Sequence, residues 1–309
     1  MFIALSFIGK LPNYIIDCIY QARIFFKDDI YLIVDDLQSP YIQQLHEYNV
    51  KIIPYETVFS NDFLNTFKQN QYKFKVLQGL GDRSLLFIRC FERFFLLQNM
   101  MKQYDLTDCL FIELDNLIYD DPNNWLSEFS KSELCYMYDN DDRGSSGIMY
   151  VKNPNSLNNF LAYTIDFIVN FNDTTNWLTE MTVLYRFYKQ YNDDSLVQIL
   201  PTLWSNPDEP NFVGAINYHR YNNTIFDAAA IGVYLLGLDP VASGHSKIIT
   251  KNQEKNKWSA IDCRKYNFEW LTDNDGRKIP HIFDGEKWIK INNLHVHSKD
   301  LRSGLSIPL

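Results

Sequence analysis

The stretch FIALSFIGKLPNYIIDCIYQARIFFKDDIYLIVDD (residues 2–36) decides the predicted fold. It begins with the apolar run 2–9 and closes with the apolar run 30–34, which an acidic pair follows. Short apolar runs that end in polar residues are typical of buried strands. Between them, residues 12–26 carry apolar side chains at helical spacing. Because two strands joined through a helix usually lie parallel, the stretch predicts a β-α-β unit.

The same alternation continues along the chain. Residues 41–49 have helical spacing and residues 50–55 form the next apolar run. A parallel sheet covered by helices is therefore favoured over an all-β or an all-α fold. Residues 84–104 are expected to form a long amphipathic helix that leads into a strand at 110–112. Further strands are expected at 133–140 and 146–153, around a polar turn at 139–147, and further helices at 156–171, 178–191 and 223–240.

The pattern changes from residue 245 onward. Asp-Gly pairs at 275–276 and 284–285 separate aromatic and β-branched runs, which predicts β-hairpins. With 309 residues and 46% hydrophobic content, the chain can bury a large core in one domain. We therefore expect a single α/β domain over residues 1–309, with a mostly parallel central sheet flanked by helices and a C-terminal β-hairpin extension.

Charge and cysteine content restrict the functional classes. The net charge of −9 and the lack of a basic stripe argue against sequence-independent binding of nucleic acid. The apolar run 1–9 is far shorter than the roughly 20 residues of a membrane span, so no membrane span is expected. Five widely spaced cysteines suit reduced core thiols, which favours a cytoplasmic protein. The abundance of Asn, Lys, Ile, Tyr and Phe is compatible with an AT-rich coding sequence such as a viral one.

Two carboxylates stand inside the apolar run LFIELDNLIYDD (residues 110–121). An unpaired carboxylate is costly to bury, so the strand must deliver the pair to an open edge or to a cation. In an extended segment Glu113 and Asp115 share one face, and a divalent cation would relieve their repulsion. A helix cap or a solvated turn remains the alternative. Residues 120–122 are expected to form a turn and a helix start.

A second polar group lies in LHVHSK (residues 294–299). In a strand His295, His297 and Lys299 would share one face, where they would repel one another as cations unless a metal or an anion lay against them. An ordinary polar strand is the alternative. Together with the two acids they make a consistent site for a metal diphosphate, with carboxylates on the ion and lysine on the phosphates. An imidazole ligand favours Mn²⁺ somewhat over Mg²⁺.

Several elements follow one another in the chain: ERF (92–94), FIELDNLIY (111–119), SSGIMYVKN (145–153), FDAAAIGVYLLGLDP (226–240) and LHVHSK (294–299). In this order they resemble nucleotide-sugar glycosyltransferases of the GT-A fold, in particular a viral and bacterial group with a DAAAIG-YL-G-DP signature. The resemblance spans most of the chain. It implies a GT-A-like sheet, a nucleotide-binding half at 1–115, an acceptor and sugar half at 116–244, and a hairpin extension with a donor-site tail at 245–309.

The resemblance also implies roles for single residues. In such enzymes the second acid of a D-x-D element holds the metal, which implies this role for Asp115. Glu113 stands in place of the first acid, which contacts the ribose or the metal shell, and it departs from the usual aspartate. A C-terminal histidine and lysine complete the metal-diphosphate site, which implies His297 or His295 together with Lys299. We expect His297 to be the metal ligand because it lies nearer the lysine, with His295 on the sugar or behind the ligands.

Other candidates have clear structural alternatives. Asp35 and Asp36 end the second strand, where related folds contact the base or the ribose, although both could simply cap the strand end. Arg93 could reach the donor sugar, but pairing with a neighbouring acid is favoured. Glu180 and Asp227 are the candidate catalytic or acceptor-side carboxylates, and each could instead cap a helix.

These observations predict a metal-dependent glycosyltransferase. The expected donor is a nucleotide-diphosphate sugar, in particular a UDP-sugar, the expected cofactor is Mn²⁺ or Mg²⁺, and the acceptor is a glycan or another hydroxyl compound. Residues 295–309 are expected to close over the donor as a strap. One alternative is a nucleotidyltransferase, which normally has a Gly-rich phosphate-binding loop after the first strand, where this sequence has a poor match. The other is a non-catalytic protein that binds a nucleotide or a sugar. A hydrolase with a His-x-His metal site is less favoured, because no second histidine cluster accompanies the motif.

Overall fold

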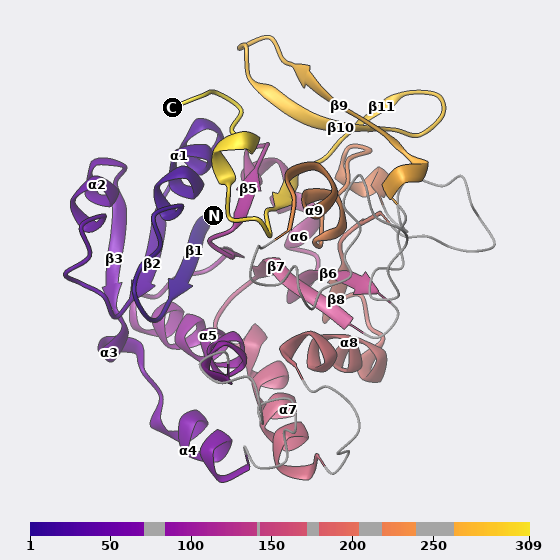
Figure 1. Ribbon diagram of the computed structural model, residues 1–309. Helices are drawn as coiled ribbons and strands as arrows, with labels where there is room; N and C mark the ends of the chain where they lie inside the picture. Colours follow the sequence, from indigo (N-terminus) through magenta and orange to yellow (C-terminus); the bar gives the residue numbers. More distant parts are fainter. Residues whose placement is uncertain (71–83, 141–142, 172–178, 204–217, 239–262) are drawn as a thin grey trace.

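Figure 1 shows the computed structural model of the protein, which describes residues 1–70, 84–140, 143–171, 179–203, 218–238 and 263–309. The strands of the central sheet are β1 (Phe2–Phe7), β2 (Ile30–Val34), β3 (Val50–Pro54), β4 (Cys109–Ile112), β6 (Leu134–Asn140), β7 (Arg143–Val151) and β8 (Val197–Ile199). They lie in the order β3-β2-β1-β4-β7-β6-β8. Only β7 is antiparallel to its neighbours in this sheet. The expected mostly parallel α/β sheet is therefore confirmed.

Helices cover both faces of this sheet (Figure 1). One face carries α1 (Ile15–Phe25), α2 (Ile42–Glu47), α6 (Leu126–Phe129) and α9 (Ala230–Leu236). The other carries α3 (Tyr55–Val58), α4 (Asn61–Asn70), α5 (Ser84–Gln103), α7 (Ser156–Asn170) and α8 (Glu180–Tyr191). In β1, Ile3 and Leu5 pack toward the first set, whereas Phe2 and Ala4 pack toward the second. A strand buried on both faces needs apolar residues along most of its length, which explains the run that opens the sequence.

A three-stranded antiparallel sheet follows near the C-terminus and projects from the main body (Figure 1). It consists of β9 (Asn267–Thr272), β10 (Lys278–Phe283) and β11 (Trp288–Lys290). Gly276 and Gly285 lie in the two turns at φ +78° and +104°, a region that favours glycine. The Asp-Gly pairs therefore mark the turns as predicted, and the C-terminal β-hairpin extension is confirmed.

The chain then returns to the main body through a short two-stranded sheet. Its strands are β5 (Asn116–Ile118), directly after the acidic pair, and β12 (Asn293–His295), with His295 opposite Asn116. After β12 the tail packs on the body: Leu301 is fully buried and the Tyr119 hydroxyl donates to the Gly304 carbonyl at 2.8 Å. Residues 296–309, which were expected to form a strap over the donor, are therefore packed against the main body.

Some boundaries differ from the predictions. Helix α9 is shorter than the expected span 223–240, because the residues before it form isolated bridges such as Thr202 with Phe226 and Ile225 with Ile291. Gly237, at φ +92°, ends the helix. The pair 239–240 and the division at 244–245 lie outside the described residues. Strands β5 and β8 and helices α3 and α4 were not predicted, and the strands have only three residues each.

Short 3₁₀ helices complete the described structure at Pro122–Trp125, Tyr218–Tyr221, Cys263–Lys265 and Leu301–Gly304. The carboxylate of Asp121 accepts the amide of Asn123 at 2.9 Å, so the expected turn and helix start at 120–122 are confirmed. All five cysteines are free thiols. Within the described ranges, no helix combines the length and the apolar character that crossing a membrane would require.

Candidate functional site

The acidic pair lies in the turn between β4 and β5. The amide of Asn116 donates to the Glu113 carbonyl at 3.0 Å, and the Glu113 amide donates to the carbonyl of Gly147 on the neighbouring strand β7 at 3.0 Å. Residues 113–115 are therefore a tight turn and not the extended segment that the sequence predicts. The prediction that both carboxylates converge still holds, because oxygens of Glu113 and Asp115 lie within 4.8 Å of each other.

His295, on β12 of the small sheet, lies against both carboxylates. Its Nε2 lies 3.2 Å from Glu113 Oε2 and 3.4 Å from Asp115 Oδ1. Its Nδ1 lies 2.8 Å from the carbonyl oxygen of Ala228, so this nitrogen carries a proton and donates it. A histidine held in this way presents its Nε2 to a ligand, the usual arrangement behind a metal-bound imidazole. The three side chains form a candidate divalent-cation site.

Lys299 and His297 lie against the same group. The chain leaves the strand after His295 and turns, so the predicted strand alternation over 295–299 is wrong, yet the predicted convergence of these side chains is confirmed. Lys299, with φ +63°, pairs through its Nζ with Asp115 Oδ2. The His297 ring centroid lies 4.6 Å from that of His295, and its buried Nε2 has no hydrogen-bond partner in the described part of the chain. The geometry thus brings His295, and not the expected His297, between the two acids.

The charges in this cluster stabilise one another. Burial tends to raise the pKa of Glu113, but Arg93 and His295 outweigh it and lower that pKa to about 2. Burial also tends to raise the pKa of Asp115, but His295 and Lys299 outweigh it and hold this pKa well below the usual range. Burial tends to lower the pKa of His295, and the two carboxylates raise it well above its ordinary value. Both acids are therefore ionised at neutral pH and ready to bind a cation.

A separate feature of His297 is its low basicity. Burial and the neighbouring His295 lower the pKa of His297 to about 3. Its imidazole is therefore neutral in ordinary buffers, which leaves a lone pair or an N–H group available to a ligand beside the acidic cluster.

Arg93 joins two of the predicted carboxylates. From α5 its guanidinium pairs with Glu113, donates to the Ser146 hydroxyl at 2.7 Å, and lies 3.5 Å from Glu180 Oε1. Pairing with acids was the favoured expectation for this arginine. Glu180 is the first residue of α8, but the cap is Thr179, whose hydroxyl accepts the amide of Thr182. Burial is the main cause that raises the pKa of Glu180.

Asp227 holds the backbone around His295. Its Oδ1 accepts the Ile231 amide at 2.9 Å, and its Oδ2 accepts the amides of Gly232 at 2.7 Å and His295 at 3.0 Å. The residue is only 2% exposed. A carboxylate with three backbone donors has little room to accept a substrate proton. The geometry gives Asp227 a positioning role, tying the start of α9 to β12, in place of the catalytic role that the sequence predicts.

Two residues that sequence reasoning missed support the same contact. A Cβ on Gly232 would lie 2.2 Å from the His295 carbonyl oxygen, so only glycine allows α9 to approach β12 this closely. The Asn293 side chain accepts the Asp227 amide at 2.9 Å and donates to Asn116 Oδ1 at 2.8 Å. Two features of the sequence could have pointed to these residues: the asparagine pair at 292–293 and the glycine within the Ala-rich motif.

Asp35 and Asp36 hold the loop after β1. Asp35 Oδ1 accepts the Gly9 amide at 2.8 Å and Asp36 Oδ2 accepts the Leu11 amide at 3.2 Å. Both side chains therefore have a structural role, but they bind the loop after β1 and do not cap the end of β2 as the alternative expected. Asp35 is nevertheless exposed, so a ligand at this edge of the sheet can reach its second oxygen.

A cavity of about 600 Å³ opens beside Lys299. It is lined by residues at and just before the starts of α1 and α2 and by C-terminal residues, among them Asn13, Tyr14, Tyr41 and Arg302. Burial raises the pKa of Tyr14 to about 12, so this phenol remains a neutral hydrogen-bonding group. The cavity has both polar and apolar walls, is large enough for a small organic ligand, and includes Lys299 of the acidic cluster in its lining.

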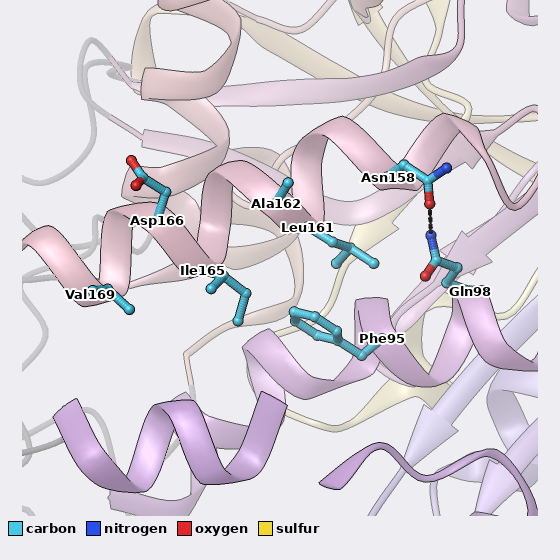
Figure 2. A pocket seen from close by; sticks show the side chains of 8 residues that line it. All are labelled: Phe95, Gln98, Asn158, Leu161, Ala162, Ile165, Asp166 and Val169. Carbon is cyan, nitrogen blue, oxygen red and sulfur yellow. Dashed lines mark hydrogen bonds between the residues drawn. The ribbon is translucent and has the colours of Figure 1, made fainter. Parts of the chain in front are cut away.

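A second hollow, of about 460 Å³, lies between α5 and α7 (Figure 2). Figure 2 shows Phe95, Leu161 and Ile165 along it, with Gln98 hydrogen-bonded to Asn158 at 2.8 Å at one end. No residue of the acidic cluster lines this hollow, whereas Lys299 of the cluster lines the cavity described above.

No protein-family model and no curated protein matches the sequence. Among solved structures, mouse xyloside xylosyltransferase 1 in its apo form is similar with a TM-score of 0.45 at 12% identity, over 65% of this chain and 85% of that one. The glycosyltransferase GlyE of Streptococcus pneumoniae TIGR4 has a TM-score of 0.40 at 12% identity, over 64% and 44% of the two chains. PaToxG glycosyltransferase has a TM-score of 0.39 at 13% identity, over 63% and 71%. Likenesses this distant do not bear on the chemistry of the present site.

Proposed function

We propose that this protein is a metal-dependent glycosyltransferase that transfers a sugar from a nucleotide-diphosphate sugar, in particular a UDP-sugar, to a glycan or another hydroxyl acceptor. The observation that supports it is the convergence of Glu113, Asp115, His295 and Lys299 from two segments far apart in the sequence. Carboxylate oxygens and one imidazole suit a divalent cation, and an ammonium beside them suits a phosphate.

The cation site fits Mn²⁺, with Mg²⁺ as the alternative. The Nδ1–H group of His295 donates a hydrogen bond to the Ala228 carbonyl, and its Nε2 faces Glu113 and Asp115. One nitrogen and two oxygen ligands therefore face a common point. An imidazole ligand favours Mn²⁺, because Mg²⁺ prefers oxygen alone. A divalent cation bound there would supply charge stabilisation to the departing diphosphate.

The remaining donor contacts come from the cavity beside the cluster. Lys299 lies between the acids and this cavity, which places its ammonium where a diphosphate would bridge them. Tyr14 and Asn13 line the same cavity and offer an aromatic ring and an amide to a nucleoside. Asp35 does not line this cavity; the oxygen that does not accept the Gly9 amide is the proposed contact for the ribose.

Glu180 is the carboxylate that we propose on the acceptor side. Its side chain is buried, and burial raises its pKa, which would suit a group that accepts a proton from a hydroxyl if the reaction inverts the anomeric configuration. Arg93 links Glu180 to Glu113, so the acceptor side and the cation side belong to one hydrogen-bonded network. A retaining reaction would need no such base.

A panel of nucleotide sugars with Mn²⁺ tests the proposal, scored by melting temperature and by release of nucleoside diphosphate. A true donor at about 100 times its dissociation constant should add about 2.7 kcal/mol to the free energy of unfolding, which a melt detects readily. We expect one UDP-sugar to raise the melting temperature and to release UDP only with metal present. A melting shift without release from any donor would instead identify a non-catalytic binder, and no shift with any nucleotide sugar would contradict the proposal.

A further inference from the structure

Asp115 is shared between two partners. Its Oδ1 faces His295 Nε2 at 3.4 Å, while its Oδ2 pairs with Lys299 Nζ. One oxygen of the principal cation ligand is therefore already bound to a cation that belongs to the chain. Any metal ion that takes this oxygen must displace the ammonium or accept it as a neighbour.

Without a metal, the acids of the cluster are already paired with groups of the chain. Glu113 pairs with Arg93, Asp115 pairs with Lys299, and His295 Nε2 lies beside both carboxylates. Arg93 is buried and held by several hydrogen bonds, whereas the Lys299 side chain is 37% exposed. A divalent cation that arrives alone meets carboxylates that are already paired, and the Lys299 ammonium beside Asp115 repels it. The exposed lysine is the one that can move away.

Lys299 also lies beside a space in which a ligand would offer its ammonium a second partner. It borders the cavity of about 600 Å³ in which the proposed nucleotide would lie, and a diphosphate there would offer the ammonium several negative oxygens. The movement concerns the side chain alone, because the backbone is anchored: the Val296 amide donates to the Asp115 carbonyl at 2.7 Å and the Lys299 amide to the Val296 carbonyl at 3.1 Å. A flexible four-carbon side chain can make this change of partner.

We propose that Lys299 exchanges Asp115 for the donor diphosphate, and that this exchange couples the binding of the cation to the binding of the nucleotide. The inference rests on the proposed function and adds a regulation of the same site. The diphosphate draws the ammonium away and frees Asp115 Oδ2 for the cation, while the cation repels the ammonium toward the diphosphate. Because coupling between two ligands is reciprocal, each binds weakly alone and tightly in the presence of the other.

Calorimetric titration of the full chain tests the exchange. Mn²⁺ is titrated with and without saturating UDP, first for the unaltered protein and then for Lys299→Met, which removes the charge and keeps most of the side-chain length. In the unaltered protein we expect UDP to tighten Mn²⁺ binding by at least about tenfold. In Lys299→Met we expect Mn²⁺ alone to bind more tightly, by about tenfold, and UDP to bind more weakly, two changes of opposite sign from one substitution.

Two further variants serve as controls. Lys290→Met removes another lysine that pairs with an aspartate, Asp120, outside the cluster, and should leave both affinities unchanged. Lys299→Arg keeps the charge and should keep the weak binding of Mn²⁺ alone. Should Lys299→Met fold poorly in a thermal melt, Lys299→Ala repeats the test at this partly exposed position.

The outcomes separate the inference from the proposed function. If the unaltered protein binds Mn²⁺ and UDP but Lys299→Met binds Mn²⁺ alone no more tightly than before, the exchange is overturned and the glycosyltransferase proposal stands. If the unaltered protein binds Mn²⁺ and UDP independently of each other, the exchange is likewise overturned. If it binds neither, both fail together.

Discussion

Asp115→Asn should lower the rate of metal-dependent UDP release by about 10²–10³-fold while the protein stays folded. The substitution keeps the shape of the side chain and removes the charge that faces His295 and Lys299. The backbone contact through which Asp115 receives the Val296 amide is unaffected, so the turn should persist. The measurement is UDP release with saturating Mn²⁺ and the donor identified from the panel, next to a thermal melt of the same sample.

The matched control is Asp120→Asn. Asp120 also pairs with a lysine, Lys290, and is partly buried, but it lies outside the cluster. Its loss should leave UDP release close to that of the unaltered protein. Release by Asp115→Asn at the unaltered rate, in a folded sample with Mn²⁺, would remove Asp115 from the cation site.

The second large effect is expected for Gly232→Ala. The added Cβ would lie 2.2 Å from the His295 carbonyl oxygen and 2.7 Å from its carbonyl carbon, and a backbone cannot yield as a flexible side chain does. Helix α9 must therefore move away from β12, which weakens the hydrogen bond from the His295 amide to Asp227. We expect the free energy of unfolding to fall by about 1–3 kcal/mol and the affinity for Mn²⁺ in the presence of UDP to fall with it.

Ala230→Gly separates the expected loss of stability from the expected loss of Mn²⁺ affinity. It weakens the same helix through the lower helix propensity of glycine, by up to about 1 kcal/mol, without adding an atom near His295. The affinity for Mn²⁺ should then stay unchanged in a destabilised protein. If both variants lose Mn²⁺ affinity in proportion to their stability, the close approach of Gly232 has no specific role in positioning the histidine.

Much of the fold could be predicted from short patterns in the sequence. The apolar runs at 2–9 and 30–34 lie in adjacent parallel strands, because both faces of the sheet are covered and only apolar side chains fit there. The Asp-Gly pairs mark the turns of the extension, since those positions require positive φ. The convergence of the acids with His295 and Lys299 could be predicted from their charges, which need one another when buried.

The details of the site could not be predicted, because they depend on which segments pack together. The choice between His295 and His297 follows from the pairing of β12 with β5 and from the Ala228 carbonyl, both set by contacts over large sequence separations. Asp227 looks like a catalytic acid or a helix cap in the sequence. Only its contact with the His295 amide shows that it links two elements. Three-residue strands such as β5 carry too little periodicity to be recognised.

The most direct test of the central claim is electron spin-echo modulation of Mn²⁺ bound to the protein together with UDP. Glu113, Asp115 and His295 are proposed to hold the cation, so the spectrum should contain the coupling of one imidazole nitrogen. That coupling should vanish in His295→Gln and persist in His297→Gln. A spectrum without nitrogen coupling, or a coupling that survives His295→Gln, would contradict the account.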